Sequence, residues 1–115
     1  MVAARKRRNI KFGEIAWLDL DPTRGNEQRG RRPVLVVSQN AYNKKTHMRI
    51  ACPITTQKKG WPFEVDLFGT QTTGCVLVDQ LKCMDFKARH AEFIEAVANN
   101  ILDEVTGKIE ALLVP

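Results

Sequence analysis

"EIAWLDLDPTRGNEQRGRRPVLVVS", residues 14–38, contains two strand patterns separated by a basic loop. In its first part, apolar residues alternate with others as far as Asp21-Pro22, a pair typical of turns. Its last part, from Pro33, is a short run rich in β-branched residues, of the kind buried on both faces of a sheet. The stretch therefore predicts two strands that flank a loop.

Three further strands are predicted downstream. "MRIACPI", residues 48–54, alternates apolar side chains with Arg49 and one alanine. Pro53 predicts an edge or a bulge near the end of this strand, because proline has no N–H for the ladder. "FEVDLF", residues 63–68, shows the clearest alternation in the chain. "CVLVDQLKC", residues 75–83, is interpreted as one buried strand that runs into polar residues.

Helical patterns are fewer. "NAYNKKTH", residues 40–47, carries turn and cap residues and can include one helical turn. "NILDEVTGKIEALL", residues 100–113, places its apolar residues on one helical face, with Asn100 as the expected cap. A helix is predicted there in spite of Gly107, which costs about 1 kcal/mol relative to alanine. "RHAEFIEAV", residues 89–97, fits either a last strand or part of a longer helix, and periodicity leaves both open.

Taken together, these patterns indicate a mainly β protein with helices. Several short strands, glycine-rich turns and a terminal helix are typical of a small, strongly bent antiparallel barrel with helical additions. A length of 115 residues suits one domain with one modest core. We expect residues 1–9 to form a flexible basic arm and residues 10–115 to form that single domain.

Positive charge is concentrated in two places. The net charge is +5, and the excess lies in the arm and in the loop from Arg24 to Arg32. Charge grouped in this way attracts polyanions, nucleic acid among them. The apolar share of 43% and the charged share of 27% are typical of a folded, soluble protein and exclude a disordered chain.

The cysteines and the hydropathy pattern indicate a cytoplasmic protein. Cys52, Cys75 and Cys83 are odd in number, lack CxxC spacing and lie in or beside apolar runs. Buried free thiols in a reducing compartment fit them better than disulfides or a zinc site. The basic N-terminus is not followed by an apolar segment typical of a signal peptide, and no apolar run approaches the ~18 residues of a membrane span.

Most kinds of catalytic site are excluded by the motifs. His47 and His90 are far apart and have no partner at ligand spacing, so we expect no metal. A phosphate-binding GxxxxGK[ST] loop and a GxGxxG motif are both absent, so we expect no nucleotide cofactor. Acid–base chemistry without a metal remains.

Glu27 is the single carboxylate inside the arginine-rich loop. Neighbouring guanidinium groups favour the ionised carboxylate, which can accept a proton, and they stabilise negative charge that develops on a phosphate. This combination suits cleavage of a phosphodiester by an internal 2′-hydroxyl. The alternative is an ion-paired glutamate that keeps a basic loop compact, and these residues alone leave both open.

Four blocks of sequence resemble the MazF/PemK family of toxin endoribonucleases from bacterial type II toxin–antitoxin systems. They are "GEIAWLDLDPTRGNEQRGRRPVLVVS", "YNKKT", "CPITTQKKGWPFEV" and "GCVLVDQLK", in the family's order and near its spacing. The resemblance covers about residues 13–113. It implies a small SH3-like antiparallel β-barrel of the CcdB/PemK kind with a C-terminal α-helix, usually a homodimer.

The resemblance also implies an activity. Family members are sequence-selective endoribonucleases that cut single-stranded mRNA without a metal, leave a 2′,3′-cyclic phosphate and a 5′-hydroxyl, and so inhibit translation and growth. An acidic, MazE-like antitoxin neutralises them. Carried over by position, the catalytic residues are Glu27, which helps to deprotonate the 2′-hydroxyl, Arg32, which stabilises the phosphorane, and Thr55, which binds the scissile phosphate. Arginine acid and base roles are also described in the family.

Further polar residues are expected to contact RNA, either as carriers of charge in the loop or by their match to the family's groove. Their alternative role is surface polarity or turn capping. Trp17 is expected in the core or an interface, and Trp61 against RNA or the antitoxin. The expected RNA-binding residues are Arg24, Arg29, Arg31, Asn43, Gln57, Lys58, Asp79, Gln80 and Lys82.

The sequence leaves two other functions open. A gyrase-poisoning toxin like CcdB shares the fold class but has no need of the Glu27, Arg32 and Thr55 set. An RNA-binding module without catalysis would keep affinity and salt dependence but release no cleavage product.

Overall fold

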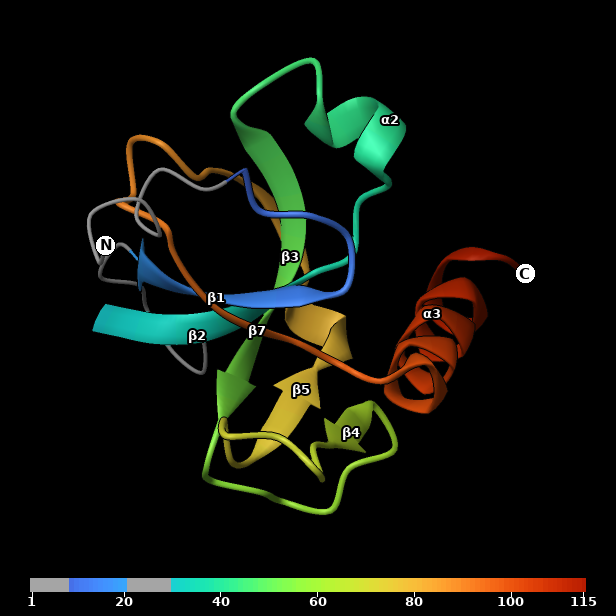
Figure 1. The fold of residues 1–115 in the computed structure, drawn as a ribbon. Coiled ribbons are helices and arrows are strands. Elements are labelled where there is room, and N and C mark those ends of the chain that lie inside the picture. Colours follow the sequence, from blue (N-terminus) through green and yellow to red (C-terminus); the bar gives the residue numbers. More distant parts are fainter. Residues whose placement is uncertain (1–8, 21–29) are drawn as a thin grey trace.

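A single antiparallel sheet is the framework of the protein (Figure 1). The computed structural model describes residues 9–20 and 30–115, and these ranges contain seven strands, two α-helices and one 3-10 helix. The strands are β1 Glu14–Leu20, β2 Gly30–Val36, β3 Met48–Thr55, β4 Glu64–Asp66, β5 Cys75–Leu77, β6 Lys82–Asp85 and β7 Glu92–Ala96. The helices are α2 Asn40–Asn43, the 3-10 helix η1 Val78–Gln80, and α3 Asn99–Leu113.

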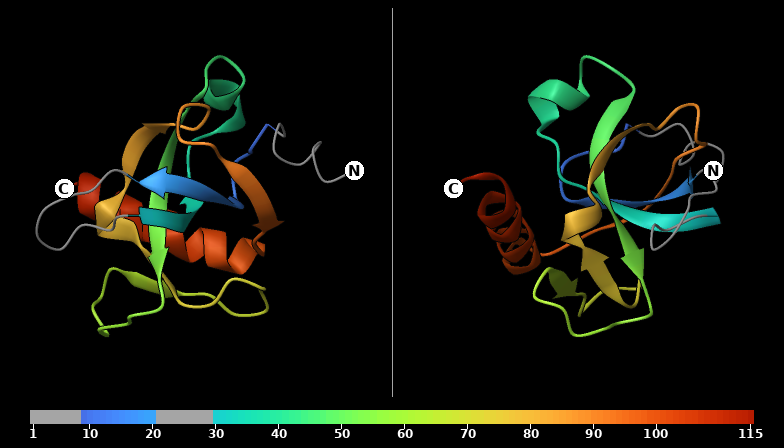
Figure 2. Two further views of the ribbon diagram at one scale, coloured as in Figure 1. Left: turned by 90° about the vertical axis from the view of Figure 1, so that its left-hand side faces the viewer. Right: turned by 180° about the vertical axis from the view of Figure 1, so that it is seen from behind.

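The sheet runs in the order β4-β5-β3-β2-β1-β7, and β6 pairs with β3 beside this path. The mainly antiparallel fold with a C-terminal helix is thus confirmed. The sheet bends strongly, as the views in Figure 2 show, but among the described strands β4 and β7 remain at its two ends, so it does not close into a complete barrel. Residues 89–97, open between strand and helix in the sequence, contain β7.

Of the edge or bulge predicted from Pro53, the edge strand is wrong, but the ladder is interrupted at this residue. β3 lies inside the sheet: β2 pairs with one side of it, while β6 pairs with its Met48 end and β5 with its Thr55 end. On the side shared by β5 and β6, neither strand has a register partner at Pro53. The missing N–H is tolerated because the ladder changes there from one strand to the other.

The prediction of one continuous strand over residues 75–83 is also wrong. β5 ends at Leu77, η1 follows, and β6 begins at Lys82. Both strands pair with β3, so the helical turn between them is where this side of the sheet bends. Asp79 and Gln80 lie in that turn and so leave the strand pattern.

Two hydrophobic clusters fill the two sides of the sheet. β2 contributes to both, since Leu35 belongs to one cluster and Val34 and Val36 to the other. This confirms that the apolar run after Pro33 is buried on both faces. In β1, Ile15 and Ala16 are both buried, because Ile15 belongs to one cluster and Ala16 to the other.

Some side chains take the opposite side to the one that alternation predicts. Arg49 is only 4% exposed, and its guanidinium donates to the backbone oxygens of Ile10, Thr46 and Met48 at 2.7–2.9 Å. Trp17 is exposed, which rules out a core position and leaves the interface alternative.

Helix α3 packs beside β4 and η1 (Figures 1 and 2). Ile101, Leu102 and Val105 face the core, as predicted, whereas Leu113 is largely exposed. The cap prediction is wrong: the helix begins after Ala98, and no side chain caps it, so Asn100 lies inside the first turn.

Gly74 brings the start of β5 against the end of β3. Its φ is +118°, and a Cβ there would lie 2.1 Å from the backbone oxygen of Thr55. Gly69 also has a positive φ, +71°, but a Cβ there would meet nothing within 4 Å. The two glycines therefore differ in steric contact rather than in the sign of φ.

We predict that Gly74→Ala lowers the free energy of unfolding much more than Gly69→Ala. Backbone strain, about 1–3 kcal/mol, acts in both variants. Only Gly74→Ala must also displace the Thr55 backbone. Urea unfolding of the two variants and the parent measures this difference, and equal losses would contradict the close approach.

Candidate active site and RNA-binding surface

Arg32 and Thr55 lie on adjacent strands. The ladder between β2 and β3 runs from Val36 and Ala51 to Val34 and Pro53, so Arg32 and Thr55 each lie two residues beyond its last pair. On its other side Arg32 pairs with Leu18 of β1. Two of the three predicted catalytic residues thus follow the same end of this ladder.

Thr55 is the last residue of β3 and is 6% exposed. Its Oγ1 accepts a hydrogen bond from the Gln57 N–H at 3.1 Å. This bond uses the oxygen as an acceptor, so the hydroxyl hydrogen can be donated elsewhere. Burial and the turn at Gln57 hold the hydroxyl in place.

Glu27, Arg24 and Arg29 lie outside the described residues. The residues on either side of this gap, Leu20 and Gly30, are register partners at the end of the β1–β2 ladder. Gly30 has a φ of +79°, a conformation that glycine adopts readily. The loop that carries Glu27 therefore begins and ends at paired positions, close in sequence to Arg32.

An open pocket of about 270 Å³ lies on the side of the sheet that Pro53 and Thr55 share. It is lined by Leu20, Pro53, Asp79, Gln80, Leu81, Lys82 and Met84. Pro53 and Thr55 lie on the same face of β3, because side chains two residues apart in a strand share a face. The pocket therefore gathers three of the predicted RNA-binding residues near Thr55 and near the start of the loop that carries Glu27.

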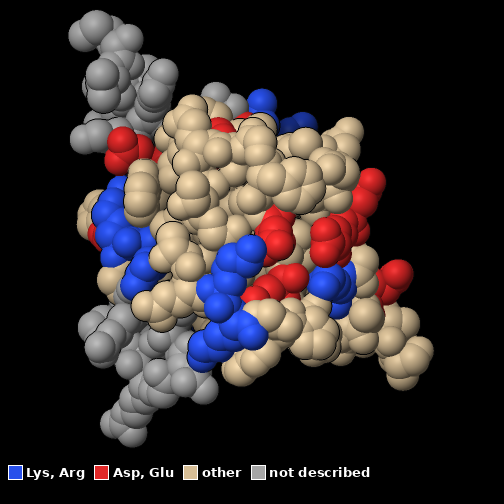
Figure 3. Space-filling model, turned by 90° about the horizontal axis from the view of Figure 1, so that it is seen from below, with Lys and Arg blue, Asp and Glu red and all other residues tan. Residues whose placement is uncertain are grey.

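Charge is unevenly distributed on the face seen from below in Figure 3. Most basic side chains lie toward the left and centre of this view, and most acidic ones toward the centre and right. Lys58 Nζ and Asp66 Oδ1 form an ion pair at 2.8 Å. The hydrogen bond that Lys58 donates to Asp66 raises the pKa of Lys58, so this lysine keeps its charge.

The segment between β3 and β4 is held by hydrogen bonds from its backbone N–H groups to a side-chain carboxylate. Glu64 accepts hydrogen bonds from the N–H groups of Lys59 and Gly60 at 2.9–3.2 Å. Trp61 is 52% exposed, and the Lys59 ammonium lies 4.9 Å from its ring centroid. An exposed aromatic ring beside a lysine is of the kind that stacks on a base, and its contact with RNA or an antitoxin stays a prediction.

Asn43 differs from the other predicted RNA-binding residues because it is buried, with 3% of its surface exposed. Its Oδ1 accepts from the Ser38 hydroxyl at 2.6 Å, and its Nδ2 donates to the Ser38 backbone oxygen at 2.9 Å. The amide is thus engaged in the turn around α2. In this structure Asn43 takes the capping role that was its alternative.

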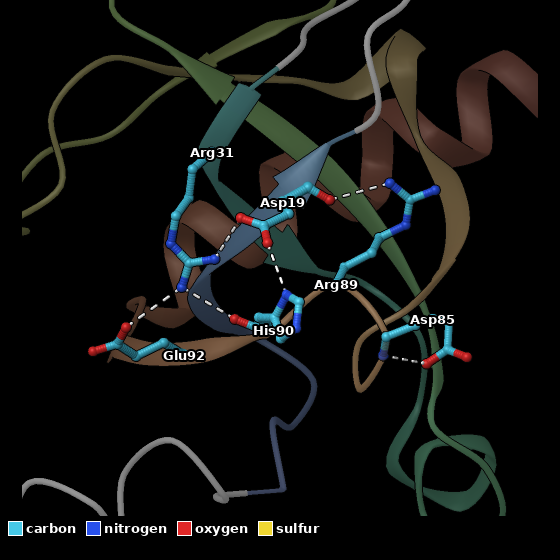
Figure 4. A network of polar contacts seen from close by, with 7 residues as sticks. Asp19, Arg31, Asp85, Arg89, His90 and Glu92 are labelled. Atoms are coloured by element: carbon cyan, nitrogen blue, oxygen red, sulfur yellow. Dashed lines mark hydrogen bonds and ion pairs between the residues drawn. The ribbon is translucent and has the colours of Figure 1, made fainter.

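Arg31 belongs to a polar network at the base of the β1–β2 loop (Figure 4). Its guanidinium contacts Asp19 Oδ1 at 2.7 Å, the His90 backbone oxygen at 3.0 Å and Glu92 Oε1 at 3.4 Å. The His90 ring lies 2.9 Å from the other Asp19 carboxylate oxygen. Sequence reasoning missed this network, because His90 and Glu92 come beside Arg31 only when β7 pairs with β1.

The hydrogen bond from Arg31 lowers the pKa of Asp19 most, and the hydrogen bond with His90 lowers it further. A carboxyl whose pKa is lower in the folded than in the unfolded state stabilises the fold above its unfolded pKa. That stabilisation is lost as the pH falls through the folded pKa.

The described residues offer neither a metal-binding cluster nor a membrane-spanning helix. Within residues 9–20 and 30–115, no group of three or more His, Cys, Asp and Glu is placed to hold a metal ion. In the same ranges no helix is long and apolar enough to cross a membrane.

The cysteine prediction holds for two residues and fails for the third. All three are free thiols, and Cys52 and Cys75 are buried. Burial raises the pKa of Cys52 to about 12. Cys83 is exposed, since its side chain points outward from β6, and its Sγ lies 3.6 Å from the Tyr42 hydroxyl.

We predict that Asp19→Asn lowers Tm between about pH 5 and 7, because the ionised carboxylate pairs with Arg31 only in the folded state. The difference from the parent should shrink as the pH falls below about 4, the ordinary range of an aspartate. Thermal unfolding across this pH range measures it. Asp103→Asn, which removes a carboxylate from α3, is the control, and a Tm difference for Asp19→Asn that persists in acid would contradict the prediction.

Known proteins are similar to this chain in sequence and in fold. Residues 11–113 match the family described as "PemK-like, MazF-like toxin of type II toxin-antitoxin system". The chain is 45% identical over 102 residues to the endoribonuclease toxin MazF of Escherichia coli strain K12, covering 89% of this chain and 92% of that protein. It is 37% identical over 114 residues to the endoribonuclease PemK of Escherichia coli, covering 95% and 86%.

Solved structures agree. The crystal structure of MazF (Form-I) from Deinococcus radiodurans matches with a TM-score of 0.86 and 41% identity, covering 92% of this chain and 97% of that one. MazF in a MazE–MazF crystal structure (Form-II) from the same organism matches with a TM-score of 0.82 and 41% identity, covering 92% and 96%. The expected PemK-like fold is confirmed, and the chain belongs to the family of PemK-like, MazF-like toxins of type II toxin–antitoxin systems.

Proposed function

We propose that this protein is a toxin endoribonuclease that cuts single-stranded mRNA at selected sequences, without a metal, and so inhibits translation and growth. One observation carries the proposal: in a chain 45% identical to an endoribonuclease toxin, Arg32 and Thr55 lie on adjacent strands, each two residues beyond the last pair of the β2–β3 ladder. A cationic donor and a hydroxyl donor on adjacent strands can bind one phosphate from two sides.

In the proposed reaction, Glu27 accepts the proton of the 2′-hydroxyl at the cleavage site. The freed 2′-oxygen attacks the adjacent phosphorus, and Arg32 and Thr55 stabilise the charge on the pentavalent phosphorane. The bond from phosphorus to the 5′-oxygen then breaks, and that oxygen takes a proton, which Arg32 can supply. The products are a 2′,3′-cyclic phosphate and a 5′-hydroxyl. General acid–base groups contribute roughly 100- to 10,000-fold each and one fixed charge donor roughly 100- to 1,000-fold.

The pocket beside Thr55 is proposed to receive a base next to the cleaved bond. Asp79 offers a carboxylate acceptor and Gln80 both donors and acceptors, which suits hydrogen bonds to a base edge. Lys82 in the pocket and Lys58 outside it suit the phosphates of the strand. Arg24, Arg29 and Gln57 are proposed to extend this contact, since they belong to the two segments that flank Arg32 and Thr55.

The partners follow from the same proposal. The MazF of Deinococcus radiodurans is found in complex with MazE. For this chain we infer a cognate acidic antitoxin of the MazE kind that covers the basic surface, and a homodimer as the active form. We place the protein in the cytoplasm, where mRNA is translated.

The two other candidate functions lack a comparable observation. A CcdB-like gyrase inhibitor acts by binding and does not require Arg32 and Thr55. A catalytically silent RNA-binding module would retain the basic surface alone. The experiment below separates all three.

The test incubates the purified protein with a long single-stranded RNA in excess EDTA and maps the new 5′ and 3′ ends by sequencing. We expect cuts at a short recurring sequence, with 2′,3′-cyclic phosphate ends. Glu27→Gln and Arg32→Ala should each reduce the rate by about 100-fold or more. Lys45→Ala is the matched control, because it removes one positive charge from an exposed position after α2.

Three outcomes would overturn the assignment. RNA binding without cleavage by the parent would indicate the silent module, and the absence of both would revive the gyrase inhibitor. Cleavage by both variants at the parental rate would show that a different set of residues performs the chemistry.

A further inference from the structure

We propose that Asp19, Arg31, His90 and Glu92 form a clamp at the base of the catalytic loop and that this clamp positions Arg32 for the reaction. These are positioning residues, which act through Arg32 without touching RNA. The inference rests on the proposed endoribonuclease function. It also replaces the expectation that Arg31 binds RNA.

The clamp joins segments that are distant in the sequence. Arg31 extends from β2, Asp19 from β1, and Glu92 from β7, while His90 lies in the turn before β7 (Figure 4). The guanidinium contacts oxygens from all three partners within 3.4 Å. A planar guanidinium with several fixed donors suits such a junction better than an ammonium does.

The location of the clamp relates it to the catalytic loop. Asp19 and Arg31 are register partners, and the next pair, Leu20 and Gly30, is the last of the β1–β2 ladder. The clamp therefore closes the ladder directly before the segment that carries Glu27. A contact at this point limits how far the two strand ends can separate.

Alternation along β2 connects the clamp to Arg32. Consecutive side chains of a strand point to opposite faces, so Arg31 and Arg32 diverge. Arg31 faces the network, and Arg32 shares the face of Val34, which packs in the cluster that also contains Leu20 and Met84 of the pocket lining. Because the two arginines share a peptide group, holding the Arg31 side chain fixes the direction in which Arg32 leaves the strand.

The backbone of His90 adopts an unfavourable conformation in the clamp. Among the described residues, His90 is the single non-glycine residue with a positive φ, 57°. This conformation is uncommon for a residue with a side chain and tends to occur where the surrounding structure requires it. It presents the His90 oxygen to Arg31 and the ring to Asp19.

The charges around Arg31 also argue against RNA contact. Two carboxylates, Asp19 and Glu92, lie within 3.4 Å of a single guanidinium. A phosphate placed against Arg31 would approach both of them, and like charges at this range repel. Arg89 also lies beside this network, because its guanidinium donates to the Asp19 backbone oxygen at 3.1 Å.

The experiment compares steady-state cleavage by the parent, Asp19→Asn, Arg31→Gln and the double variant, at a temperature well below every Tm. We expect each single variant to lower kcat by about 10-fold with little change in KM, because a misplaced catalytic group slows chemistry more than binding. The double variant should be no slower than the slower single one, since both break the same contact. Asp103→Asn is the control for loss of a carboxylate and should match the parent.

A contact with RNA would give a different pattern. If Arg31 binds a phosphate, Arg31→Gln raises KM and reduces the salt dependence of RNA binding by about one phosphate contact, while Asp19→Asn does neither. That result, or parental kcat in Asp19→Asn, would overturn the clamp.

A readout without RNA keeps this test separate from the proposed function. We expect the amides of residues 30–32 to exchange hydrogen faster in Asp19→Asn than in the parent, and those of α3 to exchange alike. If the parent cleaves no RNA, the proposed function fails, while the exchange measurement still decides whether the clamp holds the strand ends. Unchanged exchange at residues 30–32 would contradict the clamp.

Discussion

The position of β2 between β1 and β3 is the constraint on which the site depends. Its register with β1 sets Asp19 beside Arg31, and its ladder with β3 ends two residues short of both Arg32 and Thr55. Strand alternation sends the two arginines to opposite faces, so one strand separates a structural ion pair from a residue proposed for chemistry. A slip of one residue would exchange the two faces and remove both arrangements.

The bend of the sheet sets a polar pocket beside this strand. β3 is shared by β5 and β6, and the helical turn η1 between them leaves the ladder where the sheet bends. Polar residues at a bend cost little, because they are not required to pack between strands. Asp79 and Gln80 can therefore lie in the pocket without disturbing the core, while Pro53 and Leu20 form its apolar part.

Patterns within short segments predicted much of the fold and the chemistry. Alternation and turn residues located β1, β2 and the terminal helix, and the motif around Glu27 led to the family. Predictions failed where a residue's neighbours come from elsewhere in the chain. Cys83, beside an apolar run that turns polar, is exposed because β6 turns that side chain outward, and Asn43 is engaged by Ser38 rather than by solvent.

The sequence by itself determined the strands on either side of the loop that carries Glu27 and the identity of the residues that suit phosphodiester cleavage, because both follow from contacts between near neighbours in the chain. Only the tertiary structure decided which arginine is neutralised by carboxylates. Asp19 and Glu92, the carboxylates that pair with Arg31, are separated by most of the chain, and they meet only because β7 pairs with β1.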